Sequence, residues 1–178
     1  MKSIRIIVAL LMLIICLPSF AGWIDKEGNP VPDTESRKSI GEFGANLLLT
    51  DKENETFQRW NTTSVGVNLS TTDKIKRNDF ISAFIIFSGC SVNKEGNCNL
   101  VVKFRVVQPD GSIYAELPTQ EAWVNKPAPG KFLQMSAGYI KIRIEDDEPL
   151  GVYQVFADIT DQNSGNVISL SSKFEVLE

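Results

Sequence analysis

Polar and apolar side chains alternate along most of the chain after residue 42, with the period of two that half-buried β-strands show. The clearest segment runs from residue 140 to 145, where three isoleucines alternate with two basic residues and a glutamate. Segments of the same kind lie at 43–49, 65–69, 102–106, 112–116, 153–159 and 168–176, and a brief pairing is expected at 132–135. Phe80–Phe87 is almost continuously apolar, which predicts a central strand covered on both faces.

Helical periodicity is weak by comparison. Outside the N-terminal leader no long window keeps a period of 3.6 residues, and residues 51–60 are expected to form one helical turn at most. Residues 118–130 hold three prolines and a glycine around Trp123, so they are predicted to be mostly loop. A series of about eight to ten short strands favours an all-β fold, an antiparallel β-sandwich, with a closed barrel as the alternative.

The first 21 residues have the pattern of a secretory signal peptide. Lys2 and Arg5 precede an uncharged apolar stretch over 6–17, and small residues at 19 and 21 suit cleavage before Gly22. The stretch is shorter than the roughly 20 residues that a membrane-spanning helix needs. We therefore expect a periplasmic or secreted protein without a transmembrane anchor after cleavage; lipid attachment at Cys16 is the alternative, although Ile15 is bulky for a lipoprotein signal.

Three regions follow from these patterns: the signal peptide at 1–21, an extended N-terminal arm at 22–41 and a single β-sandwich domain at 42–178. The full chain of 178 residues has a formal net charge of −4, and cleavage removes two basic residues and no acid. Such an acidic protein is a poor ligand for nucleic acid. Because the chain has no histidine, it cannot use Ser-His-Asp or Cys-His hydrolysis or a His-ligated metal, and we expect no cofactor.

The mature chain keeps two cysteines, Cys90 and Cys98, on either side of a turn-rich segment. In an oxidising compartment we expect them to form a disulfide that joins two antiparallel strand ends. A redox-active or metal-binding pair would need Cys-x-x-Cys spacing or further ligands, and the sequence has neither.

Two short patterns resemble the immunoglobulin-like modules of secreted bacterial proteins and the macroglobulin-type domains. One is the turn Pro109-Asp110-Gly111 between a strand and a short return strand. The other runs from Pro149 to Ala157, includes Gly151-Val152-Tyr153, and is followed by Asp161 and a glycine-containing hairpin. The resemblance covers roughly residues 80–177 and implies an immunoglobulin-like sandwich. It carries no activity residues to this chain.

Three groups of residues are candidates for function. Lys103, Arg105, Lys141 and Arg143 point outward on two amphipathic strands and would form a basic face if those strands are neighbours, although such residues also simply solvate a sheet. Tyr114 and Trp123 are a candidate binding loop, since exposed aromatic side chains anchor interfaces and stack on sugars. The acidic run that includes Asp146 and Asp147 suggests a weak Ca²⁺ site or, more simply, a solvated turn, and we predict no metal.

These features favour an exported, non-enzymatic binding protein that acts by protein–protein interaction in the cell envelope or the extracellular space. An inhibitor or immunity protein is one concrete version of that role. The alternative is a carbohydrate-binding module that holds a polysaccharide with its loop aromatics. An enzyme would need a pocket in which carboxylate, lysine or serine side chains converge.

Overall fold

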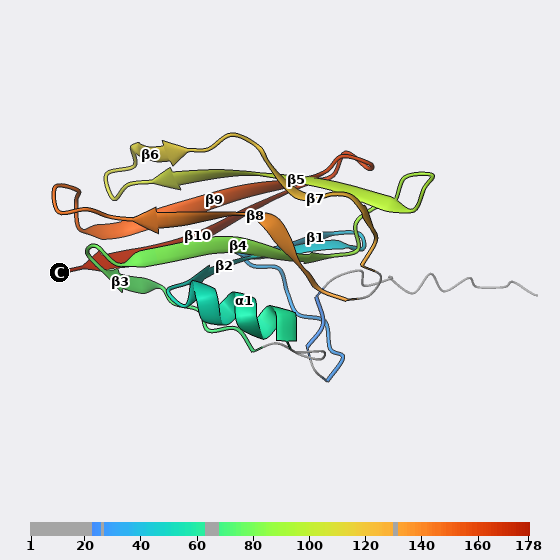
Figure 1. Cartoon of the computed structure of the whole chain (residues 1–178), viewed down its shortest axis with the longest axis horizontal. Helices are drawn as coiled ribbons and strands as arrows, with labels where there is room; N and C mark the ends of the chain where they lie inside the picture. Colours follow the sequence, from blue (N-terminus) through green and yellow to red (C-terminus); the bar gives the residue numbers. More distant parts are fainter. Residues whose placement is uncertain (1–22, 26, 63–67, 130–131) are drawn as a thin grey trace, which may run out of the picture.

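The computed structural model describes residues 23–25, 27–62, 68–129 and 132–178. Within them the chain forms a mostly β structure with one helix (Figure 1). In chain order the elements are β1 (Arg37–Ile40), β2 (Phe43–Thr50), α1 (Glu53–Thr62), β3 (Lys74–Lys76), β4 (Phe80–Ser88), β5 (Asn97–Val107), β6 (Ile113–Glu116), β7 (Gln120–Pro127), β8 (Gln134–Arg143), β9 (Gly151–Asp161) and β10 (Val167–Leu177).

The strands form two separate sheets. One has four strands in the order β1-β2-β4-β8. The other has six: its order is β3-β10-β9-β5-β6, and β7 also pairs with β5. All pairs are antiparallel except β3 with β10, which is parallel. The all-β sandwich is therefore confirmed, and the closed barrel that was its alternative is not formed by the described strands.

Alternating side chains fill the space between the sheets, as the period of two predicts. In β5, for example, Leu100, Val102 and Phe104 are fully buried, while Lys103 and Arg105 lie on the outer face. Burying large apolar side chains in this way stabilises the fold by about 1.5–3 kcal/mol for each one.

The prediction of a central strand covered on both faces is confirmed by β4. It lies between β2 and β8, and on one side Ile81, Ile85 and Phe87 belong to the main core. On the other side Phe84 and Ile86 form a second apolar cluster, against which Phe57 and Trp60 of α1, Trp23 and Leu48 pack. Helix α1 thus covers part of the outer face of the four-stranded sheet (Figure 1).

The sequence underestimated this helix, which has ten residues rather than one turn. Glutamates in its first turn and Arg59 in its last turn suit the helix dipole, and an ion pair joins Arg59 to Glu55 at 2.7 Å. Only Phe57 and Trp60 supply large apolar side chains to the sheet. A stripe that narrow gives too little periodic signal to distinguish a helix from a loop.

A second difference is β7, which occupies most of the segment predicted to be loop. Its residues pair with the first half of β5, with two irregularities in the register. Pro127 comes at its end, where no further ladder hydrogen bond is needed. Since pairing with β5 and not alternation defines this strand, the local pattern did not reveal it.

The arm predicted at 22–41 ends in a strand, because Arg37–Ile40 pairs with β2 at the edge of the four-stranded sheet. Of the strand predicted at 65–69, residues 65–67 lie outside the described residues, and Leu69 packs against the second cluster without belonging to a strand. The predicted signal peptide also lies outside them. No helix in the described part of the chain is long and apolar enough to cross a membrane.

Candidate binding site at the disulfide end of the sandwich

The predicted disulfide between Cys90 and Cys98 is present and closes the connection between β4 and β5. Inside this loop, Asn93 accepts hydrogen bonds through its side-chain oxygen from the backbone N–H groups of Glu95 (3.1 Å) and Asn97 (2.9 Å). The backbone N–H of Asn93 also donates to the carbonyl of Asn97. The turn is therefore fixed both by the covalent bridge and by its own hydrogen bonds.

The loop also lies directly against the turn between β1 and β2. Gly89 has a φ of +68°, and a Cβ at this position would lie 1.8 Å from the carbonyl oxygen of Glu42. Only glycine allows both the conformation and the close approach. This contact brings a second connection to the same end of the sandwich.

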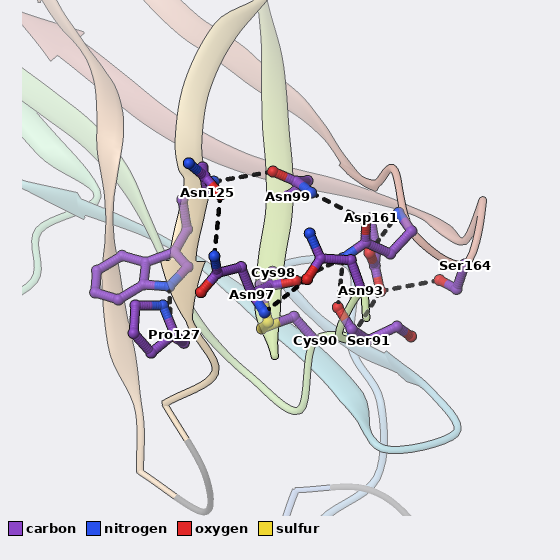
Figure 2. The surroundings of a disulfide bond; sticks show 12 residues. Cys90, Ser91, Asn93, Asn97, Cys98, Asn99, Asn125, Pro127, Asp161 and Ser164 are labelled. Atoms are coloured by element: carbon purple, nitrogen blue, oxygen red, sulfur yellow. Dashed lines mark hydrogen bonds between the residues drawn. A yellow bond between two sulfur atoms is a disulfide. The ribbon is translucent and has the colours of Figure 1, made fainter. Parts of the chain in front are cut away.

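Asp161 joins the disulfide loop to the β9–β10 turn. Its side chain is fully buried, and its carboxylate accepts hydrogen bonds from the backbone N–H of Ser91 (2.8 Å), the backbone N–H of Asn163 (3.0 Å) and the hydroxyl of Ser164 (2.9 Å). A buried carboxylate is costly unless such donors surround it. Figure 2 shows it beside the disulfide, between segments about 70 residues apart in the chain.

Asparagine side chains extend this network across three strands (Figure 2). The amide of Asn163 donates to the carbonyls of Ser91 and Asn97, both at 2.9 Å, and its oxygen accepts from the amide of Asn99. Asn99 in turn accepts from the backbone N–H of Asn125, whose side chain accepts from Asn97. The end of the sandwich is thus a single hydrogen-bonded platform.

Exposed apolar side chains stand on the connections at this end. Val92 in the disulfide loop is 51% exposed, and Phe132, at 76%, is followed by Leu133 just before β8. The backbone N–H of Ala128 donates to the carbonyl of Gly96, so the segment after β7 is attached to the disulfide loop. In Figure 1 the β4–β5 and β9–β10 connections, the end of β7, the start of β8 and the β1–β2 turn all lie toward the same end of the molecule.

Trp123, one of the two aromatic residues proposed from the sequence, is near this end but is packed. Its indole N–H donates to the carbonyl of Pro127 at 3.0 Å, and its ring meets Phe87 edge-on with centroids 5.9 Å apart. The ammonium of Lys126 lies 4.7 Å from the ring centroid. The indole of Trp123 is therefore half-buried by these contacts and packs β7 against the core.

Tyr114, the other proposed aromatic, is not near Trp123. Trp123 pairs with Leu100 in β5, whereas the partner of Ala115, beside Tyr114, is Val106. Six residues of strand separate the two positions, which is roughly 20 Å. The structure therefore does not bring the two rings into one binding loop.

Tyr114 instead belongs to the opposite end of the sandwich. Its hydroxyl lies 3.0 Å from the carbonyl of Arg143 and 3.1 Å from a carboxylate oxygen of Glu148, and its ring meets Tyr153 edge-on. Burial, followed by the hydrogen bond and the charge of Glu148, raises the pKa of Tyr114 to about 12. Tyr114 is therefore a packed residue with a neutral hydroxyl.

The basic face proposed from the sequence is not formed, because the two strands that carry its residues are not neighbours. Lys103 and Arg105 lie in β5 of the six-stranded sheet, whereas Lys141 and Arg143 lie in β8 of the other sheet. Each also has a local partner. Lys103 pairs with Glu116, Arg105 stacks 4.5 Å from the centroid of Phe156, Lys141 pairs with Glu53, and Arg143 lies over Phe80.

Two carboxylates of the acidic run before Pro149 accept hydrogen bonds from nearby groups of the protein. Asp146 accepts from the side chain of Asn78 at 2.7 Å, and Glu148 accepts from the backbone N–H of Glu145 at 2.6 Å. Asp147 has no ion pair or hydrogen bond with the described residues. Over those residues, no three acidic or cysteine side chains lie close enough together to hold a metal ion.

Sequence reasoning missed the platform built on Asp161 and the asparagines. It treated Asp161 and the residues after it as a hairpin, and it did not connect them with the disulfide loop. The available signal was the set of asparagines near strand ends, but asparagine is common in turns, and the pairing of distant segments cannot be read from one of them.

The sequence matches no protein-family model, and no curated protein is significantly similar to it. Among solved structures, it is similar to a family 123 glycoside hydrolase from Clostridium perfringens (TM-score 0.42, 13% identity), covering 76% of this chain and 27% of that one. A DNA glycosylase, AlkC, from Pseudomonas fluorescens gives 0.37 and 15%, covering 60% and 28%. A CARDB domain from Pyrococcus furiosus gives 0.36 and 12%, covering 83% and 100%. At these scores none of the three bears on function.

Proposed function

We propose that this protein is an exported, non-enzymatic binding protein that captures a partner protein at the disulfide end of its sandwich. The observation that carries the proposal is the combination found there: exposed apolar side chains at 92, 132 and 133 stand beside connections that hydrogen bonds and a disulfide hold in place. The expected partner surface is an apolar pocket with polar groups at its rim.

Physical chemistry favours such a surface for binding. Loops that are ordered before the partner arrives lose little conformational entropy on association, so more of the contact energy appears as affinity. Large apolar side chains such as Phe132 suit the centre of an interface. The asparagine and serine side chains around the centre offer both donors and acceptors, as the recognition loops of antibodies do.

The proposed place of action is the periplasm or the extracellular space. The leader at 1–21 has the pattern of an export signal, and a disulfide that staples a loop suits an oxidising compartment. An inhibitor or immunity protein is the concrete version that we favour, because a small rigid domain that presents one fixed end suits blocking another protein.

The alternative, a carbohydrate-binding module that uses Tyr114 and Trp123, has little support. A binding platform made by these two rings would need both of them to be accessible on one face. These two rings lie roughly 20 Å apart along β5 and both pack against other aromatic side chains.

Site-specific photocrosslinking in the native exporting cell tests the proposal. A photoreactive residue at position 92 or 132 is expected to give one discrete adduct of the same size, whereas at positions 110 and 147, on the opposite end, it gives none. Phe132→Ala should remove the adduct formed from position 92 while the protein stays folded, since Phe132 is 76% exposed. Equal adducts from both ends, or none at position 92 or 132, would contradict the proposal.

A further inference from the structure

A polar cleft lies well away from the disulfide end, between the start of α1, strand β3 and the uncovered part of the four-stranded sheet. Its volume is about 680 Å³, within the usual range for small-ligand sites. Its floor is the row Thr50, Ser82 and Lys141, which are direct cross-strand partners on the outer face of β2, β4 and β8. Residues 51–55 form one wall and β3 forms the other.

Three different functional groups meet on this floor. The buried hydroxyl of Ser82 donates to the Oε2 atom of Glu53, and the ammonium of Lys141 lies 3.4 Å from the same oxygen. Over the described residues, no hydrogen bond or ion pair engages the other carboxylate oxygen, Oε1. Glu53 is thus held in place on one side and keeps an acceptor for a ligand on the other.

The charges of the cleft balance. Four lysines and four carboxylates line it, and most of them already have partners, such as Lys52 with Asp51 and Lys74 with Glu175. Among the residues that the structure describes, Lys76 and Asp79 form no side-chain ion pair. One ammonium and one carboxylate without ion-pair partners, together with the open oxygen of Glu53, suit a ligand that is neutral overall and rich in hydrogen-bonding groups, and they do not suit a polyanion or a polycation.

The free edge of β3 is closed to an added peptide strand. The hydroxyl of Thr72 donates to the carbonyl of Lys74 at 2.8 Å and accepts from its backbone N–H at 3.2 Å. The carbonyl of Lys76 accepts from the backbone N–H of Asp79. Strand addition depends on such groups being unpaired, so an extended peptide is not the ligand that fits this cleft.

An aromatic ring completes the lining. Phe80 is 48% exposed, and its orientation is fixed by Lys141 and Arg143, which lie 4.7 Å and 5.6 Å from the ring centroid. A fixed, accessible ring beside carboxylate, amine and hydroxyl groups offers both an apolar surface for C–H groups and partners for hydroxyls.

We propose that this cleft binds a neutral oligosaccharide, with Phe80 as the apolar wall and Glu53 as the acceptor for sugar hydroxyls. Lys76 and Asp79 supply a further donor and acceptor at the rim. The site is separate from the disulfide end, so it gives the protein a second binding activity that is independent of partner capture.

Protein-observed NMR on the mature chain tests this inference. The probes are three neutral hexasaccharides, cellohexaose, maltohexaose and N-acetylchitohexaose, each taken to about 10 mM, with heparin oligosaccharides and oligolysine as charged comparisons. At least one neutral probe is expected to give saturable shifts at the amides of Lys76, Ser82 and Lys141. Phe80→Ala and Glu53→Gln should each weaken the binding of that probe by about tenfold.

Val152→Ala, an exposed apolar position on the other sheet, is the matched control and should leave binding unchanged. Absence of shifts with all three neutral probes, stronger binding of either charged polymer, or shifts that both cleft variants leave intact would overturn the inference. The photocrosslinks from positions 92 and 132 should be unaffected by the cleft variants, so the two proposals fail independently.

Discussion

A single carboxylate, Asp161, organises the end of the molecule where we place the function. It is fully buried and satisfied by three donors, one in the disulfide loop and two in the β9–β10 turn. A neutral amide of the same shape cannot accept three hydrogen bonds, because its nitrogen faces a donor.

Asp161→Asn is therefore expected to lower the free energy of unfolding by about 2–3 kcal/mol, the usual cost of losing hydrogen bonds to a buried charged group. Urea denaturation measures the change. Asp158→Asn, three residues earlier on the exposed side of β9, serves as the control and should stay within about 0.5 kcal/mol of the wild type. Equal effects of the two substitutions would show that Asp161 does not hold the loops together.

At the opposite end of the sandwich, the raised pKa of Tyr114 makes a measurable prediction. Burial and Glu148 raise its pKa to about 12, and the proton is therefore bound more tightly in the folded state than in the unfolded state. Its contribution to stability is fully present below pH 10 and is lost as the pH rises towards 12. In a tyrosinate absorbance titration of the folded protein, Tyr114→Phe should remove a component with a pKa near 12; removal of one near 10 would contradict the assignment.

Substitutions of Trp123 and Phe132 distinguish a packing role from a binding role near the disulfide end. Trp123→Ala should lower the free energy of unfolding by about 2–3 kcal/mol, since the half-buried indole packs on Phe87 and hydrogen-bonds to Pro127. The sequence had instead suggested Trp123 as an exposed contact residue of a binding loop. Phe132→Ala, at an exposed position, should change stability by less than about 0.5 kcal/mol. A stable Trp123→Ala variant that no longer captures the partner would restore the earlier hypothesis.

Among the helices and strands, the sequence predicted those whose structure is determined by residues close together in the chain. Strands β2, β5, β9 and β10 were predicted because their apolar side chains alternate with polar ones, and β4 because it is almost continuously apolar; a local pattern records both features. The disulfide was predicted because its cysteines are eight residues apart. Helix α1 and strand β7 were not, because a narrow apolar stripe defines the helix and pairing with β5 defines the strand.

The candidate site depends on contacts between residues that are far apart in the chain, so the sequence predicted even less of it. Asp161 meets a donor 70 residues away, and Asn163 and Asn97 meet across two connections. The aromatic and basic candidate residues were selected from the sequence by their type. Residue type does not reveal that Tyr114 and Trp123 lie at different ends, or that β5 and β8 lie in different sheets.

The β4–β5 connection is the element in which the covalent and hydrogen-bonded constraints coincide. Replacing both cysteines, Cys90→Ser with Cys98→Ser, should cost about 2.5 kcal/mol, the loop-entropy value for a closed loop this short. Urea denaturation with and without a thiol reductant measures it. The reductant should destabilise the wild type by a similar amount and leave the double variant unchanged; an equal response of both proteins would mean that the bridge is not the constraint.

On the scale of the whole molecule, the two sheets pack on one core and separate two surfaces. The disulfide end carries the platform and the exposed apolar residues, and the cleft beside β3 lies away from it on the outer face of the four-stranded sheet. In the two proposals, one end of this small domain binds a partner protein and the cleft binds a second ligand.

Amide hydrogen exchange of the free mature protein tests most directly whether the disulfide end is ordered before any partner binds. The account predicts that the backbone N–H groups of Ser91, Asn97, Asn125 and Asn163, which donate to side-chain oxygens in the platform, exchange as slowly as those of the neighbouring strands. Cleaving the disulfide should speed exchange at these four amides and leave those around Tyr114 unchanged. Exchange of all four at the rate of an unstructured loop, with the disulfide intact, would contradict the account.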